Sequence, residues 1–403
     1  MMTHPSPWII DPISYTGLAY YDISLAKGLA RNGVAAVLIG ADDFLLSRHR
    51  RHGVPILPLF RGTSTGSRAR RGANYVRSLI RLLMAAAHER PALAHWQYFQ
   101  LLPADLAAIT LMKRLRIPMI YTAHEIMPWR NQGRVGRIFL RAIYRSMDRI
   151  IVHNRSDRLR VAEQFGVDRH RVRVITHGDF ALFAHPDLDQ DVARCRLGLP
   201  QDAAVALFFG TLRPSKGLDV LLAAWPLVVE HLPAAHLVVA GQPDRDLSRQ
   251  TLVALQRMGG DPRTRGSVTL RLQKIADADI NAYYRAADVV VLPYHAITTS
   301  GVLRYAYSSA RPVVATVVGE HAIWVRHGVT GELVAPGDPT ALARSLLALL
   351  SDRNRCAALG LEALRFARAH FNWERIGSDT AALYAEVGRG TRRGFDSEEA
   401  PAI

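Results

Sequence analysis

The sequence predicts an α/β protein with two parallel-sheet domains in tandem, and three observations lead to this prediction. Short apolar runs alternate with segments of helical periodicity, which is the pattern of β-α-β units. The alternation forms two series, separated near residues 177–190 by a polar, turn-rich stretch. The chain has 403 residues, which is more than one hydrophobic core usually supports.

The first series predicts short, strongly apolar strands with amphipathic helices between them. The expected strands are Trp8–Asp11, Ala35–Gly40, Ala92–Trp96, Met119–Ala123, Arg149–Val152 and Val172–Thr176. The expected helices span residues 18–32, 73–88, 101–115, 134–147 and 155–165. We interpret residues 61–71, which hold four arginines, as a loop that carries mobile positive charge.

The second series repeats the pattern and ends in two helices. Its expected strands are Val205–Phe209, His236–Ala240, Val268–Arg271, Val289–Leu292, Val313–Ala315 and Gly331–Val334. Its expected helices span 217–231, 246–259, 279–286, 300–309, 320–327, 339–350, 352–370 and 373–388. We therefore expect one domain over 1–180 and another over 181–371. The Gly-, Arg- and Glu-rich residues 389–403 are expected to be disordered.

The composition excludes several classes of protein. Hydrophobic residues make up 49% and charged residues 21%, which excludes disordered and fibrous chains. Two cysteines, Cys195 and Cys356, exclude a disulfide scaffold and a cysteine-based zinc site. The N-terminus lacks the pattern of a signal peptide, and no run of 18 apolar residues occurs. We expect a cytoplasmic protein, either free or lying on a membrane surface.

The positive charge is concentrated in the first half of the chain. Of the formal net charge of +16, residues 1–180 carry +15. Such asymmetry indicates an anionic partner, either nucleic acid, a membrane surface or an acidic ligand, although a solubility function is the alternative. Because aromatic residues are not interleaved with the arginines and no nucleic-acid motif occurs, we do not expect nucleic acid.

One basic helix is a candidate for the membrane surface. Arg134, Arg137, Arg141 and Arg145 recur every three or four residues, with bulky apolar residues between them. This pattern is typical of a helix that lies on an anionic membrane. The alternative, which βα units favour, is a helix that packs on a sheet and exposes a solvated basic face.

The loop after strand Val205–Phe209 has the features of a diphosphate site. The strand ends at Gly210, a helix begins near Gly217, and Arg213 and Lys216 lie between them. Two cations next to the free amides of a helix N-terminus favour a diphosphate, whereas the alternative is a solvated loop.

Two further loops follow buried strands in the same half. Thr299, Ser300, Gly301 and Val302 begin a helix after the strand Val289–Leu292, and their side chains and amides can cap that helix, hold a phosphate or do both. Gly319 permits close approach of a ligand to the backbone. Glu320 either accepts hydrogen bonds from ribose or sugar hydroxyls or favours the next helix N-terminus.

In the first half, strand Met119–Ala123 ends in His124 and Glu125. A histidine–carboxylate pair at the carboxyl end of a strand suits acid–base or hydrogen-bonding chemistry, although a single histidine is more often structural. Metal-ligand spacings are absent. The Asp-x-Asp pairs lie in polar loops before helices, so we interpret them as helix caps.

Several of these segments occur in an order that is characteristic of one family. They are Gly210 with Lys216–Asp219, Ala287–Tyr294, Ser300–Leu303, Pro312–Thr316, Gly328–Asp338 and Phe371–Ile376. Together they resemble the donor domain of family-4 (group 1) retaining glycosyltransferases. The first half is similar more weakly, through Ala19–Gly33, Tyr121–His124 and Ile151–Asn154. The resemblance implies the GT-B fold, in which two Rossmann-like domains face a cleft and the C-terminal helix near 373–388 completes the first domain.

The resemblance also implies roles for the site residues. Arg213 and Lys216 would bind the donor diphosphate and act in catalysis, with His124 near the donor sugar. The loop Thr299–Gly301 would hold the distal phosphate and the sugar. Gly17, His124 and Glu125 are expected on the acceptor side.

The expected substrates are a nucleotide-diphosphate sugar and a saccharide or polyprenyl-diphosphate-linked acceptor at an anionic membrane surface, as in polysaccharide or lipopolysaccharide assembly. No cofactor or metal is expected, because the cations and helix amides offset the charge of the leaving diphosphate.

The chain departs from the family at two positions. Members often carry Glu-x7-Glu before the Pro312 segment, where this chain has Ile297 and Tyr305. We hypothesise that Glu320 supplies a carboxylate instead. Two alternatives remain open, namely a GT-B sugar-nucleotide epimerase and a degenerate member that binds its ligand without catalysis.

Overall fold

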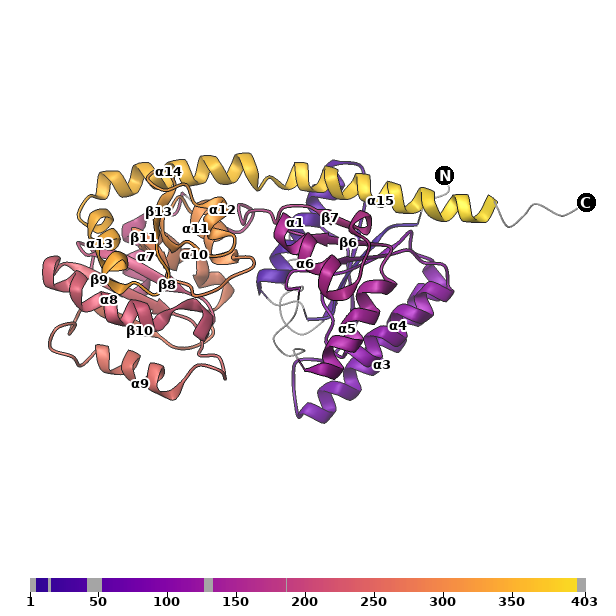
Figure 1. Cartoon of the computed structure of the whole chain (residues 1–403), viewed down its shortest axis with the longest axis horizontal. Coiled ribbons are helices and arrows are strands. Elements are labelled where there is room, and N and C mark those ends of the chain that lie inside the picture. The colour runs from indigo at the N-terminus through magenta and orange to yellow at the C-terminus, as the bar shows by residue number, and fades with distance from the viewer. Residues whose placement is uncertain (1–4, 14–15, 42–52, 127–132, 186, 397–403) are drawn as a thin grey trace, which may run out of the picture. The chain divides into compact units, whose positions relative to one another are not determined.

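The computed structural model describes residues 5–13, 16–41, 53–126, 133–185 and 187–396 (Figure 1). The chain divides into two compact units. Unit 1 comprises residues 1–178 and 372–403, and unit 2 comprises residues 179–371. Each unit has its own parallel sheet and its own core, and each is described separately below.

Within the described residues, unit 1 contains a seven-stranded parallel sheet in the order β3-β2-β1-β4-β5-β6-β7. The strands are β1 (Trp8–Asp11), β2 (Val37–Ala41), β3 (Ile56–Phe60), β4 (Ala94–Trp96), β5 (Met119–Thr122), β6 (Arg149–Val152) and β7 (Val172–Val174). Most of these strands are buried along their length, as expected for a parallel sheet that is covered on both faces.

The helices of unit 1 cover the sheet on two faces. They are α1 (Thr16–Arg31), α3 (Arg68–Glu89), α4 (Leu102–Arg114), α5 (Arg134–Ser146), α6 (Arg155–Phe165) and α15 (Trp373–Asp396), with a short 3-10 turn, η3 (Arg169–Arg171). Helices α3, α4 and α5 pack side by side, and α1 packs against α15 (Figure 1). The chain moves from β1 to β2 in one direction and from β4 to β5 in the other, so right-handed crossovers place α1 and α4 on opposite faces.

The C-terminal helix α15 belongs to unit 1 because it crosses α1 at two glycines. A Cβ atom on Gly28 would overlap the carbonyl of Trp373, and one on Gly377 would overlap the backbone of Gly28. Further along α15, the Tyr384 hydroxyl lies 2.7 Å from Nδ1 of the buried His95. The crossing therefore requires small residues and is followed by a buried polar contact.

The length of helix α15 shows that part of the expected disordered tail was predicted wrongly. Residues 389–396, expected to be disordered, continue the helix to Asp396, whereas 397–403 lie outside the described residues. Once a helix is docked, each added residue contributes a hydrogen bond without a new nucleation cost. The helix therefore extends through Gly388 and Gly390.

Two segments near residue 60 also differ from expectation. Strand β3 was not predicted, because it is a partly exposed edge strand that contains Pro58. The expected loop 61–71 ends at Ser67, whose hydroxyl accepts a hydrogen bond from the Arg70 amide and caps α3. Arg68, Arg70 and Arg71 therefore lie in the first turn of a helix.

Unit 2 contains a parallel sheet that has, within the described residues, six strands in the order β10-β9-β8-β11-β12-β13. They are β8 (Ala204–Phe209), β9 (Ala235–Ala240), β10 (Val268–Arg271), β11 (Val289–Leu292), β12 (Val313–Thr316) and β13 (Gly331–Val334). The surrounding helices are α7 (Gln190–Leu197), α8 (Leu218–His231), α9 (Arg249–Met258), α10 (Asp277–Ala286), α11 (Gly301–Ser308), α12 (His321–Trp324), α13 (Pro339–Leu350) and α14 (Arg353–His370), with the 3-10 turn η4 (Pro214–Lys216) before α8.

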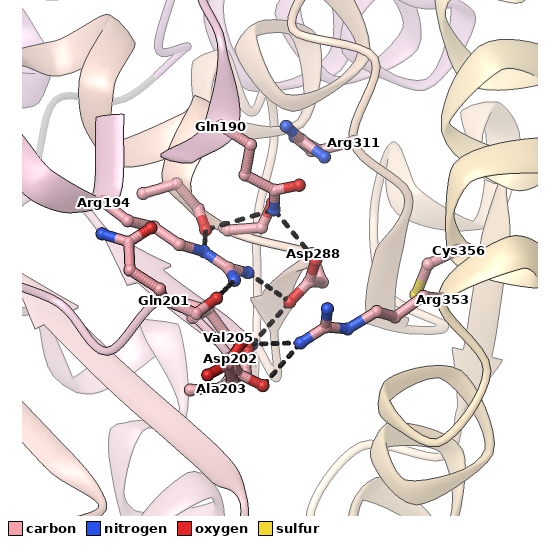
Figure 2. Close-up of polar contacts among 12 residues, drawn as sticks. Gln190, Arg194, Gln201, Asp202, Ala203, Val205, Asp288, Arg311, Arg353 and Cys356 are labelled. Carbon is pink, nitrogen blue, oxygen red and sulfur yellow. Dashed lines mark hydrogen bonds and ion pairs between the residues drawn. The ribbon is translucent and has the colours of Figure 1, made fainter. Parts of the chain in front are cut away.

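A buried polar cluster fastens α7 to the amino ends of β8 and β11 (Figure 2). The Asp288 carboxylate accepts hydrogen bonds from the Val205 amide at 2.7 Å, from Gln190 Nε2 at 2.9 Å and from Arg194 Nη2 at 2.9 Å. Ligands of parallel α/β sheets bind at the carboxyl ends of the strands. This cluster lies at the amino ends, so we interpret it as a structural anchor.

Candidate functional site

The strand order of unit 2 places two of the predicted loops next to each other. The chain runs outward from β8 through β9 to β10, and then returns to β11 beside β8. The loops that leave the carboxyl ends of β8 and β11 therefore diverge at a topological switch point, where open α/β sheets bind ligands. These loops hold Gly210–Gly217 and Pro293–Gly301.

Glycines allow the backbones of these loops to approach closely. Gly217 has φ of 65°, and a Cβ atom there would overlap the carbonyl of Pro293 from the β11 loop. Gly210 has φ of 93°, and its carbonyl lies where a Cβ atom on Gly241 would be. Larger residues at Gly217 or Gly241 would separate the loops.

The two predicted cations lie in the loop after β8. Lys216 Nζ donates a hydrogen bond to the Phe209 carbonyl at 3.0 Å and lies 5.6 Å from the centre of the Tyr294 ring. Burial, together with the nearby charge of Arg213, lowers the pKa of Lys216 to about 7. Arg213 Nε donates to the Asp244 carboxylate at 3.1 Å. Lys216 therefore gains a charge readily when an anion enters.

The loop after β11 contributes the N-terminus of α11. The Ser300 hydroxyl accepts a hydrogen bond from the Leu303 amide at 3.2 Å, so Ser300 is the cap. Val302 lies beside Gly210, because a Cβ atom on Gly210 would be 3.7 Å from Val302 Cγ2 and 2.7 Å from Lys216 Nζ. The structure thus brings Gly210, Lys216 and the first turn of α11 together.

Thr299 and Gly301 flank this cap. The hydroxyl of Thr299 has no hydrogen-bond partner among the residues that the structure describes. A Cβ atom on Gly301 would make only ordinary contact with the ring of Phe180. Steric crowding therefore does not require glycine at this position.

Glu320 has a different environment from the one we hypothesised. Its carboxylate forms a two-pronged ion pair with Arg304, with distances of 2.7 and 2.8 Å, and accepts a hydrogen bond from the Ser300 amide. The side chains of Arg304 and Glu320 are 0% and 1% exposed. Both carboxylate oxygens are thus engaged within the protein, and the side chain is buried rather than presented to a ligand hydroxyl. Glu320 is thus placed to hold the start of α11.

Gly319, next to Glu320, is required by its backbone. It has φ of 48°, and a Cβ atom there would overlap the carbonyl of Ile297. The loop after β12 is therefore held against the loop after β11.

Unit 1 presents a row of side chains at the carboxyl ends of its central strands. Gln97, His124 and His153 directly follow or lie just beyond β4, β5 and β6. His124 Nε2 lies 2.9 Å from Gln97 Oε1, and its Nδ1 lies 3.2 Å from His153 Nε2. Burial, followed by the charges of His153 and His95, lowers the pKa of His124 well below its usual value. His124 is therefore neutral near pH 7.

The remaining residues predicted on the acceptor side are more exposed. Glu125 is exposed beside His124, and Gly17 is exposed in the first turn of α1. Residues 127–132, which follow this segment, lie outside the described residues.

The predicted membrane helix α5 divides into two parts. At its C-terminal part, Arg141 and Arg145 donate from Nε to the Phe165 carbonyl at 3.3 and 3.1 Å, and so cap the end of α6. At its N-terminal part, Val135 and Ile138 are 67% and 66% exposed, next to the exposed Arg134 and Arg137. Two of the four arginines of this helix, Arg141 and Arg145, thus have a structural role.

Four residues at these sites were not predicted. Asp244 balances Arg213, Arg304 holds Glu320, and Gln97 and His153 contact His124. His153 follows strand β6 as His124 follows β5, so the same position rule applies to it. Gln97 follows β4 in the same way.

Among the described residues, no helix is long and apolar enough to cross a membrane, and no group of three potential metal-ligating side chains occurs.

Two family models match the chain in succession. Residues 15–178 match glycosyltransferase family 4, and residues 203–352 match the glycosyl transferases group 1.

The chain is also similar to curated proteins named D-inositol 3-phosphate glycosyltransferase. The protein from Thermobispora bispora is 31% identical over 68% of this chain and 66% of its own length. The protein from Salinispora tropica is 32% identical over 68% of this chain and 60% of its own length, and that from Xylanimonas cellulosilytica is 32% identical over 68% of each. The chain thus spans about two thirds of the length of these relatives.

Solved structures show the same fold. HepE from Anabaena, crystallised with UDP and glucose, superposes with a TM-score of 0.74 at 20% identity, over 95% of this chain and all of that one. Sucrose-phosphate synthase from Thermosynechococcus elongatus gives 0.74 at 21% identity, over 96% of this chain and all of that one. The two parallel-sheet units, the glycine-crowded switch point and these matches agree, and the chain belongs to the family-4, group 1 glycosyltransferases with the GT-B fold.

Proposed function

We propose that the protein transfers a sugar from a nucleotide-diphosphate sugar to a phosphate-bearing acceptor. The observation that carries the proposal is the switch point of unit 2, where Lys216 lies beside the first turn of α11 and Arg213 lies close enough to Lys216 to lower its pKa. These groups offer positive charge and free amides to a diphosphate. When the glycosidic bond breaks, charge develops on the leaving diphosphate, and groups already in place stabilise it.

The donor proposal has support from the structural relatives. HepE was crystallised with UDP and with UDP-glucose. We therefore propose a UDP-sugar as the first donor to test. The family resemblance favours retention of the anomeric configuration, with no metal needed for the diphosphate.

Because positions 297 and 305 hold no glutamate, other groups of the protein are needed to recognise the donor sugar. Tyr305 is buried, stacks on Tyr284 at 4.4 Å between ring centres and donates to the Phe183 carbonyl. The Ile297 carbonyl packs closely against the backbone of Gly319. Both positions serve packing, so the donor sugar must be recognised by other groups, such as the Thr299 hydroxyl.

The acceptor is proposed from charge and from the relatives. The relatives are named for an inositol phosphate, and residues 1–180 carry a net charge of +15. Both favour an acceptor that bears phosphate. An inositol phosphate and a polyprenyl-diphosphate-linked saccharide are the two forms to compare, because each presents phosphate next to a hydroxyl-bearing ring.

We also propose that unit 1 contacts an anionic membrane surface through the start of α5. Val135 and Ile138 project from the helix beside Arg134 and Arg137, which is the arrangement of an interfacial helix. On α3, Val76, Ile80 and Met84 form a second exposed apolar row at four-residue spacing. These exposed apolar and basic side chains favour a position of the protein at the membrane, where a lipid-linked acceptor would be found.

The test begins with thermal denaturation in the presence of UDP-glucose, GDP-mannose and dTDP-glucose, because a bound donor must raise the stability of the folded state. The donor that stabilises the protein is then incubated with inositol 3-phosphate or with a polyprenyl diphosphate saccharide, and the product is analysed by mass spectrometry and NMR. A glycosylated product with the donor's anomeric configuration supports the proposal. Epimerised donor supports the epimerase, and binding without donor hydrolysis or transfer supports the degenerate member.

A further inference from the structure

A chain of hydrogen bonds links four groups at the carboxyl edge of the unit 1 sheet. It runs from the Ile175 carbonyl to His153 Nδ1 at 3.0 Å, from His153 Nε2 to His124 Nδ1 at 3.2 Å, and from His124 Nε2 to the side-chain amide of Gln97 at 2.9 Å. His153 is 2% exposed and Gln97 is fully buried. The protons along this chain can be counted from one end.

The count begins at the Ile175 carbonyl, which can only accept. His153 must therefore carry a proton on Nδ1. If His153 is neutral, its Nε2 has a lone pair, and the bond to His124 requires a proton on His124 Nδ1. A neutral His124 then has a lone pair on Nε2, which needs a donor from Gln97.

The Gln97 amide satisfies this requirement when its nitrogen faces His124. Amide oxygen and nitrogen are assigned from their hydrogen bonds, and with the oxygen facing His124 the Gln97 Nε2 has no partner among the described residues. That orientation also demands a third proton, so that one buried histidine would be charged. Turning the amide pairs the buried nitrogen with His124, moves the unpaired position to the amide oxygen and leaves both rings neutral, so that no buried cation is required.

Aromatic packing keeps the His124 ring in this arrangement. The Tyr21 ring meets His124 edge-on, with 4.6 Å between ring centres, and also contacts His153 and His177. Burial and neighbouring histidines lower the pKa of His124, which agrees with a neutral ring. A ring flip would have to displace these contacts.

We propose that His153 is a positioning residue that holds His124 in the tautomer with its proton on Nδ1, so that His124 Nε2 is a hydrogen-bond acceptor. A substrate hydroxyl that displaces the Gln97 amide then donates a hydrogen bond to Nε2. The part that His124 plays in sugar transfer rests on the proposed function, whereas its tautomer is measurable without any substrate.

The direct test is a long-range proton–nitrogen NMR spectrum of the full chain labelled with ring-¹⁵N histidine at pH 7. The resonances of His124 are assigned by their loss in His124→Gln. We expect a protonated Nδ1 and an unprotonated Nε2 in the wild type. In His153→Leu the proton should move to Nε2, whereas His153→Gln, which keeps an acceptor at the position of Nε2, should retain the wild-type tautomer. His170→Leu, an exposed histidine of the same unit, is the matched control.

Three outcomes overturn the assignment or its catalytic consequence. A wild-type His124 protonated on Nε2 rejects the tautomer without reference to any activity. An unchanged spectrum in His153→Leu rejects the role of His153. With the donor found by thermal denaturation, we expect kcat to fall at least tenfold in His153→Leu with KM changed less than threefold, and to recover in His153→Gln. Equal kcat values in both variants would reject the catalytic consequence alone.

Discussion

Donor binding should depend on pH through Lys216. In the free protein, burial and Arg213 lower the pKa of Lys216 to about 7, so about half of the molecules carry the ammonium group at pH 7. A diphosphate next to Nζ favours the charged form and raises the pKa in the complex. If only the charged form binds well, the affinity scales with the charged fraction, which falls to about one tenth at pH 8. We expect binding to weaken about fivefold from pH 7 to pH 8 and to change by at most about twofold from pH 7 to pH 5.5.

Isothermal titration calorimetry with UDP-glucose measures both quantities. Two phosphate-free buffers of different ionisation enthalpy give the number of protons taken up. We expect an uptake of about 0.5 proton at pH 7, about 0.9 at pH 8 and nearly none at pH 5.5, because the missing protons must be supplied on binding. The diphosphate of UDP-glucose has no titrating group in this interval, so the uptake reports on the protein.

Two variants separate Lys216 from other groups. Lys216→Arg keeps a positive charge at every pH used, so its affinity should not vary and its proton uptake should vanish. Arg213→Met removes the second cause of the lowered pKa and should move the midpoint of the pH dependence upward. Tight binding by the wild type with no proton uptake and a constant affinity from pH 5.5 to pH 8 would refute the reasoning.

The other predictions concern the loops, the buried pair and the membrane helix. Gly217→Ala should abolish donor stabilisation in thermal denaturation because the added Cβ separates two loops, whereas Gly198→Ala, with nearly the same φ but open space around it, should cost only about 1–2 kcal/mol and leave donor binding intact. Arg304→Met and Glu320→Gln should each lower the free energy of unfolding in urea by about 3–5 kcal/mol, and the double variant by less than their sum. Ile138→Asp should reduce flotation with vesicles that contain anionic lipid at low salt. Equal flotation of the variant and the wild type would contradict the proposal that α5 contacts the membrane.

Most of the strands that the sequence predicted best are buried. The predicted bounds of β1, β6, β11 and β13 agree with the structure at both ends, because a buried strand of a parallel sheet is a largely apolar run with polar or turn residues on either side. The half-buried edge strand β10 was also predicted correctly at both ends. Strand β3 and helix α7 lack that signal. Helix α7 is short and largely polar, and only its cap Asp189 and the following Gly198 mark its ends.

The candidate site was predictable as far as backbone position determines it. Lys216 and Ser300 were found because each lies between a buried strand and a helix N-terminus, a position that the strand order then makes adjacent. Side-chain partners could not be found in this way. Glu320 meets Arg304 across 16 residues and His153 meets His124 across 29, and such contacts depend on how the helices and loops pack rather than on a local pattern.

The pair Arg304–Glu320 has an electrostatic consequence for donor binding. The Ser300 amide donates a hydrogen bond to the Glu320 carboxylate, and the Leu303 amide donates one to the Ser300 hydroxyl. The first-turn amides that remain available for a phosphate are therefore those of Gly301 and Val302. A carboxylate so near would repel the phosphate, and Arg304 cancels its charge. Arg304→Met should therefore weaken donor binding, whereas Glu320→Gln, which leaves the cation, should weaken it less or strengthen it, although both destabilise unit 2. Equal losses of donor affinity in the two variants would mean that the pair acts through stability alone.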